Sequence, residues 1–261
     1  MQIICYFVTF FACTIGRICG MGGGVIIKPV LDSTGLYEVA VINCLSGCAV
    51  IGMSSWSIWK FVDKKGSRIQ LDVTIPLAIG AVIGGIVGKK AYESIEGLFV
   101  DSNTAGGIQA ALLFLAVLAT LIYTANQRRF ATLHTSNKLA CVSIGAGLGM
   151  LGTFLGIGGG PFNMAALFFF FSMTPKDATQ NSLFIILISQ MAGLLSTIQS
   201  GILFTIPASL ICGMVLCGII GGEIGGRINR HISEDTVTLL LNASMVLVML
   251  ICIYNVGKYL A

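Results

Sequence analysis

Long apolar stretches separated by short polar segments run through the whole chain. Their even hydrophobicity predicts α-helices, eight of them with roughly the length that crosses a membrane. Two shorter apolar pieces, at about 25–31 and 161–173, follow the first and the fifth of these helices. The first stretch is short for a complete span unless it continues through the glycines that follow it. The eight predicted helices lie at about 1–15, 37–59, 73–91, 103–125, 139–156, 178–199, 205–226 and 236–257.

A glycine motif separates the long helix from the short piece in each half of the chain. Residues 16–24 read GRICGMGGG and residues 152–160 read GTFLGIGGG, so that all five glycines coincide. Two such runs in register indicate an internal duplication. Each consecutive glycine costs a helix about 1 kcal/mol relative to alanine, so each run is expected to interrupt a helix. Backbone freed in this way is tolerated at membrane depth only if it is buried in protein or lines a wet cavity.

The duplication divides the chain into a first repeat, 1–126, a connector, 127–137, and a second repeat, 138–261. Each repeat carries an Ile-Pro pair at the start of its third helix, at 75–76 and 206–207. We expect the two repeats to form one integrated membrane domain. Isolated glycines, such as Gly84 and Gly213, are expected to let helices pack closely.

The basic residues between the helices predict how the repeats face. Lys60, Lys64, Lys65 and Arg68 form the most basic loop, and the connector is basic as well. Since cytoplasmic loops are rich in Lys and Arg, both segments are expected on the cytoplasmic side. The counterpart of the first loop, near Gly201, then falls on the external side. The sequence therefore predicts inverted-topology repeats, in which the two short pieces are re-entrant or half-helices.

Composition supports a membrane protein. Hydrophobic residues make up 56% of the chain and charged residues 10%, whereas soluble domains are about 25% charged. The mean hydropathy is +0.93. The net charge of +4 lies mostly in loops and is expected to orient the chain rather than to bind nucleic acid. His134 and His231 fall in loops, and no Cys/His spacing typical of zinc is present, so neither a metal nor a cofactor is expected.

The paired motifs resemble those of the sulfite exporter TauE/SafE family of permeases. The resemblance rests on GIGGGP at 156–161 and DATQNS at 177–182, and it extends over essentially the whole chain. The first motif is looser, because Val25 stands where the second has proline. The resemblance implies a permease of the cell membrane that moves a sulfur-containing or organic anion such as sulfite, thiosulfate, a sulfonate or sulfoacetate.

Backbone amides freed at the two glycine runs are the first candidates for an anion site. Such amides, together with the positive end of a half-helix dipole, suit an oxyanion. Inverted-repeat transporters build midplane sites from two such breaks, so the two runs should face each other. The alternative for the glycines is close helix packing. The candidates are Gly22, Gly23, Gly24, Gly158, Gly159 and Gly160.

Polar side chains on the following helices are candidates to complete the site. Asn43 and Ser46 follow the first run, and Gln180 and Asn181 follow the second. Uncharged amides and hydroxyls can hold an anion and still release it. The alternatives are hydrogen bonding between helices and helix capping. Gln190 is expected to pack or to line a wet surface.

Three charged residues near the apolar segments have two interpretations each. Arg17 and Lys28 either counter the anion or extend toward lipid headgroups. Glu223 either carries a coupling proton or forms a salt bridge with Arg227, four residues further on. The sequence leaves these alternatives open.

We therefore predict a secondary transporter of small anions, whose partners are the anion and the lipid bilayer, with a homodimer left open. An anion channel is the first alternative. An intramembrane enzyme is the second, and it is disfavoured because no histidine and no pair of acids lies inside one apolar segment.

Overall fold

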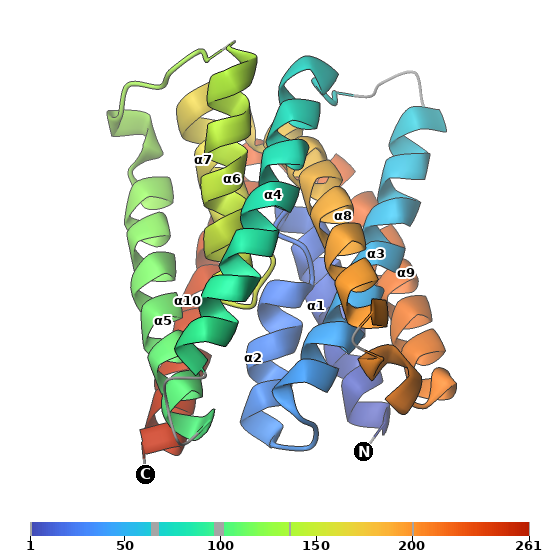
Figure 1. The fold of residues 1–261 in the computed structure, drawn as a ribbon. Helices are drawn as coiled ribbons and strands as arrows, with labels where there is room; N and C mark the ends of the chain where they lie inside the picture. Colours follow the sequence, from blue (N-terminus) through green and yellow to red (C-terminus); the bar gives the residue numbers. More distant parts are fainter. Residues whose placement is uncertain (1, 64–67, 97–101, 136, 200, 261) are drawn as a thin grey trace.

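A computed structural model describes residues 2–63, 68–96, 102–135, 137–199 and 201–260, and this part of the chain is helical with connecting loops (Figure 1). Lys64 and Lys65 of the predicted basic loop lie outside the described residues. The helices are α1 (Gln2–Cys19), α2 (Gly24–Thr34), α3 (Val39–Asp63), α4 (Leu71–Glu96), α5 (Ser102–Ala125), η1 (Gln127–Arg129), α6 (Lys138–Phe154), α7 (Gly160–Phe171), α8 (Pro175–Gln199), η2 (Ile202–Thr205), α9 (Ala208–His231) and α10 (Glu234–Leu260).

Seven of the described helices are long and apolar enough to cross a membrane, namely α1, α3, α4, α5, α8, α9 and α10. The apolar helices α6 and α7 are shorter. Eight spans were predicted, and the one that falls short is the fifth, at 139–156, which corresponds to α6 and ends at Phe154 after 17 residues. Helix α1 continues through Gly16 to Cys19, so the continuation that the sequence required for a full span is confirmed.

Both glycine runs interrupt the helices as predicted, and two pairs of equivalent glycines have nearly the same φ angle. Gly20 and Gly156 have φ angles of 74° and 72°, and Gly22 and Gly158 have 73° and 69°. These left-handed values favour glycine. The amides of Gly22 and Gly158 each donate to the carbonyl of the glycine six residues earlier, at 3.2 and 3.1 Å. A third equivalent pair, Gly23 and Gly159, differs, since Gly23 has a φ of −72° and Gly159 has a φ of 82°.

The two glycine loops touch each other through reciprocal contacts. A Cβ atom added to Gly24 would lie 3.9 Å from the carbonyl oxygen of Ile157, and one added to Gly160 would overlap the carbonyl oxygen of Met21. Gly24 and Gly160 are equivalent in the two motifs, as are Met21 and Ile157. In Figure 1 the hairpin of α1 and α2 and the hairpin of α6 and α7 open toward opposite ends of the molecule.

Glycine faces also hold the long helices together, across the two halves of the chain. Helix α6 packs on α4, and α1 packs on α9. A Cβ on Gly84 would overlap the backbone of Ala146 in α6, and one on Gly213 would overlap the ring of Tyr6 in α1. Close packing at these two isolated glycines is thus confirmed. Each glycine hairpin is therefore seated on helices from the other half.

Candidate functional site

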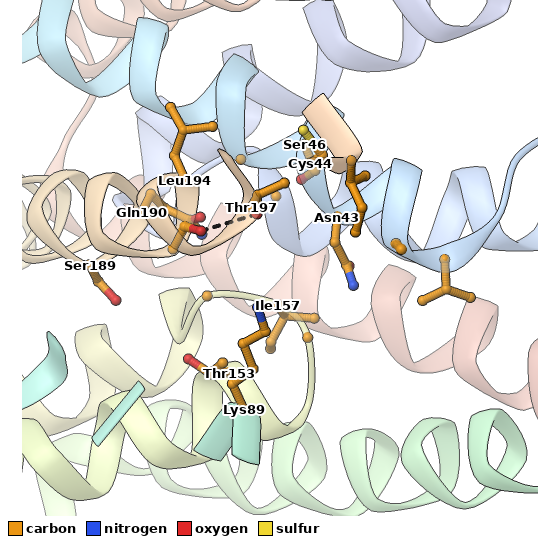
Figure 2. Close-up of a pocket in the computed structure, with 18 of the residues that line it drawn as sticks. Asn43, Cys44, Ser46, Lys89, Thr153, Ile157, Ser189, Gln190, Leu194 and Thr197 are labelled. Atoms are coloured by element: carbon orange, nitrogen blue, oxygen red, sulfur yellow. Dashed lines mark hydrogen bonds between the residues drawn. The ribbon is translucent and has the colours of Figure 1, made fainter. Parts of the chain in front are cut away.

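A cavity of about 370 Å³ lies where α3 and α8 approach the second glycine loop (Figure 2). It is lined by residues of both glycine motifs and of α3, α4, α5, α8 and η2. The lining residues are Gly24, Val39, Ala40, Asn43, Cys44, Ser46, Gly47, Lys89, Gln109, Thr153, Gly156, Ile157, Gly158, Ser189, Gln190, Gly193, Leu194, Thr197 and Ile202.

Glycine backbone forms part of the cavity wall. Gly24, the first residue of α2, comes from the first motif, and 156–158 come from the second. A Cβ on Gly24 would lie 3.1 Å from Oγ of Ser46, and one on Gly158 would overlap Nε2 of Gln190. The neighbouring polar side chains therefore approach the peptide units closely because no glycine side chain intervenes.

Uncharged polar side chains supply most of the remaining hydrogen-bonding groups. Figure 2 shows Asn43 extending from α3 toward the second glycine loop, with Thr153 and Lys89 on the opposite side of the cavity. Gln109 enters from α5 and donates its Nε2 to the carbonyl of Phe154 at 2.7 Å. Amide groups both donate and accept, so this wall can adapt to the oxygens of a small solute.

Four of the predicted site residues line this cavity, namely Gly24, Asn43, Ser46 and Gly158. The other four motif glycines are buried within the loops, where each lies against another part of the protein. Added Cβ atoms would meet Ile186 at Gly22, Cys13 at Gly23, Asn163 at Gly159 and Met21 at Gly160.

Gln180 and Asn181 lie outside the cavity, at the start of α8. Oε1 of Gln180 accepts from the amide of Arg68 at 3.1 Å. Oδ1 of Asn181 accepts from the amide of Gln70 at 2.9 Å and from the hydroxyl of Thr74. The interhelical alternative is thus realised, because these amides join the start of α8 to the start of α4.

Arg17 and Glu223 also lie away from the cavity-lining residues. Arg17 is buried beneath the ring of Phe61, with Cζ 4.5 Å from the ring centroid. Its Nε and Nη1 have no hydrogen-bond partner within the described chain. Glu223 forms ion pairs with Lys60 at 2.7 Å and with Arg227 at 2.8 Å. The salt bridge to Arg227 that the sequence allowed is therefore present, and proton coupling through Glu223 stays a prediction.

Several lining residues were not anticipated. Lys89, Gln109 and Thr153 come from α4, α5 and α6, which are far from the α2–α3 segment in sequence. A lone amide in an apolar helix, as at Gln109, was the available signal.

The sequence profile described as "Sulfite exporter TauE/SafE" matches residues 5–252. The chain belongs to this family. A relative, the "Probable membrane transporter protein YunE" of Bacillus subtilis (strain 168), is 28% identical over 258 residues, which is 90% of this chain and 91% of the relative. No solved structure matches. The TauE/SafE chain is therefore a multi-pass membrane transporter protein and not an enzyme, as predicted.

Proposed function

We propose that this TauE/SafE protein is a secondary transporter for a small sulfur-containing or organic anion, such as sulfite, thiosulfate, a sulfonate or sulfoacetate. The observation that carries the proposal is the cavity where both glycine motifs meet amide and hydroxyl side chains. Helix α2 begins at Gly24, which lines the cavity, so its positive dipole end is close to the solute. Hydrogen bonds from neutral groups hold an oxyanion without the strong pairing that would slow its release.

The binding site that we propose consists of Gly24, Asn43, Ser46, Gly158 and Gln190. The first four were predicted from the sequence, and Gln190 joins them because its amide touches Gly158. Gln180, Asn181, Arg17 and Glu223 are not carried into this site, since they do not line the cavity.

We further propose that the two halves are inverted repeats, with α6 and α7 forming one hairpin that enters and leaves from the cytoplasmic side. The opposite directions of the two hairpins in Figure 1 and the reciprocal loop contacts support this arrangement. The basic segments 60–72 and 127–137 would face the cytoplasm. The site would then lie near the middle of the bilayer on a pseudo-two-fold axis.

In this orientation the cavity extends from the two glycine motifs toward the external side of the protein. Its walls come from the first turns of α3 and from the last turns of α4 and α8. At the other end of α4 and α8 lies a set of polar contacts that we call the cytoplasmic latch. The ion pair between Arg68 and Asp177, at 3.2 Å, is one of these contacts. Transport would require the contacts of the latch to break. The latch consists of Arg68, Gln70, Thr74, Asp177, Gln180 and Asn181.

The proposal is tested by flux into and out of liposomes containing the purified protein. Sulfite, thiosulfate, sulfoacetate, taurine and chloride are compared at equal concentration. We expect saturable flux of at least one sulfur anion, with acceleration when the same anion is present on the opposite side. Flux without saturation or exchange would favour the channel alternative, and absence of flux for every anion would overturn the proposal. An interior-negative potential favours anion exit by about 2.3 kcal/mol per charge per 100 mV, so export would need no proton gradient, whereas uptake would need protons or another coupled cation.

A further inference from the structure

A buried lysine lies directly behind the cavity wall. Lys28 of α2 is only 4% exposed. Its Nζ donates to Oε1 of Gln109 at 3.3 Å, and a Cβ on Gly156 would overlap Nζ. Gln109 and Gly156 both line the cavity. The ammonium group is therefore in contact with two residues of the wall although Lys28 itself does not line the cavity.

The equivalent position in the other hairpin holds an apolar side chain. Met164 is the counterpart of Lys28, and it lies against Gly20, the counterpart of Gly156. A Cβ on Gly20 would lie 2.9 Å from Sδ of Met164. Since the two loops have the same φ at these glycines, a methionine can fill this position. The local fold therefore does not require an ammonium group.

A charge at this depth is costly, and charges inside membrane proteins commonly serve function. The carboxylate of Asp32, one turn further along α2, attracts the ammonium group of Lys28 electrostatically. The side of the ammonium that touches Gln109 and Gly156 faces the cavity wall. Its field there is weakly screened, because the surrounding protein has a lower dielectric constant than water.

We propose that Lys28 provides a buried positive charge that helps to select anions at this cavity, acting through Gln109 and the wall, whereas Lys89 lines the cavity directly. The inference rests on the proposed function and adds to it a source of charge selectivity. Lys28 is a positioning residue in this scheme: it orients Oε1 of Gln109 toward itself and stabilises negative charge across the wall. An anion held in this way forms no direct ion pair and can leave.

The test is Lys28→Met, which copies the side chain found at the equivalent position. Affinities are measured by calorimetry on the purified protein for two sulfonates, methanesulfonate with one charge and sulfoacetate with two. Since Coulomb energy scales with ligand charge, we expect affinity to fall about tenfold for the monoanion and about a hundredfold for the dianion. A role in packing alone would lower both affinities by the same factor, and that result would overturn the proposal.

Two further variants complete the experiment. Met164→Leu, at the equivalent apolar position, is the matched control and should leave both affinities unchanged. Lys28→Gln removes the charge but keeps a polar side chain beside Gln109, and it should also weaken the dianion more than the monoanion, which keeps the test valid if Lys28→Met does not fold. If the unaltered protein binds the sulfonates and neither charge variant changes their affinities, this inference alone is overturned. Absence of binding of both sulfonates by the unaltered protein would overturn it together with the proposed function.

Discussion

Gly158 and Gly193 line the same cavity, but only one of them needs to be glycine. Gly158 has a φ of 69°, and a Cβ there would overlap the amide of Gln190. Gly193 lies inside α8, and a Cβ there would meet nothing within 4 Å. The backbone at Gly158 is therefore constrained both by its conformation and by the approach of a side chain.

We expect Gly158→Ala to abolish anion transport and Gly193→Ala to preserve it. The first substitution costs about 1–2 kcal/mol for a left-handed residue and displaces Gln190 from the wall. The second substitution should stabilise α8 by about 1 kcal/mol, because alanine favours a helix more than glycine does. Transport rates in liposomes, normalised to folded protein measured by size-exclusion chromatography, check the pair. Equal transport by both variants would contradict a wall that depends on bare backbone at Gly158.

Asn43 permits a test in which only charge changes. Asn43→Asp keeps the size of the side chain and adds a carboxylate that faces the cavity, so repulsion should lower anion transport by at least about tenfold. Asn43→Ser keeps a hydroxyl donor and should lower it only a few-fold. Initial rates against substrate concentration separate the two variants. Equal rates for the Asp and Ser variants would remove Asn43 from the proposed site.

The sequence predicted some of the cavity residues because they are local to the motif. Asn43 and Ser46 lie three residues apart on the helix after the first glycine run, so they share a face. Gln180 and Asn181 hold a similar place after the second run but find partners at the start of α4. Long-range contacts of that kind leave no trace in spacing, and the same is true of Lys28 and Gln109, which are 81 residues apart.

Helices α4 and α6 approach each other through glycines on both sides. Cβ atoms on Gly80 and Gly84 would overlap the backbone of α6, and Cβ atoms on Gly145 and Gly149 would overlap the backbone of α4. Without a hydrophobic driving force between helices in lipid, such packing holds them together. The pair is therefore expected to move as a unit during transport.

We expect Gly84→Leu to destabilise the protein by about 3 kcal/mol or more, because the side chain forces the two helices apart. Gly147→Leu is the matched control, since Gly147 is exposed on α6 and a Cβ there would meet nothing within 4 Å. Thermal unfolding followed by size-exclusion chromatography measures both. A melting temperature for the Gly84 variant equal to that of the control would show that α4 and α6 tolerate separation.

At the level of elements, the sequence predicted the helices and their breaks because glycine runs act locally. It did not predict that α6 would stop at Phe154, two residues before the estimated end. The end is fixed by the turn itself, in which the amides of Ile157 and Gly158 bond back to Gly152. Backbone bonding inside a loop depends on φ angles that hydrophobicity does not report.

In the whole molecule, helices of the first half of the chain pack on helices of the second half. Helix α1 packs on α9, α6 packs on α4, and α5 packs on α10. The contacts between the two glycine loops lie among these helix pairs. A movement that opens one end can therefore be balanced by closure at the other, which is what alternating access would require of the inverted repeats that we propose.

The cytoplasmic latch gives the most direct test of that movement. Asn181→Leu leaves the amide of Gln70 and the hydroxyl of Thr74 without their partner, at a cost of roughly 1–3 kcal/mol to the closed state. Cys44 lines the cavity, so the rate at which its thiol is modified measures how easily a reagent reaches the cavity. We expect an impermeant anionic thiol reagent, added from the cytoplasmic side, to modify Cys44 about tenfold faster in this variant, the factor that 1.4 kcal/mol represents.

Peptide mass spectrometry locates the modified thiol among the nine cysteines. Asn242→Leu is the control, because Asn242 accepts a hydrogen bond of 2.7 Å from Thr124 and thereby joins α5 to α10 away from the latch. If both variants expose Cys44 equally, the effect is general loosening of helix packing. If neither does, the contacts between α4 and α8 are not what separates the cavity from the cytoplasm. Faster modification in the Asn181 variant alone would identify the cytoplasmic latch as the element whose opening completes transport.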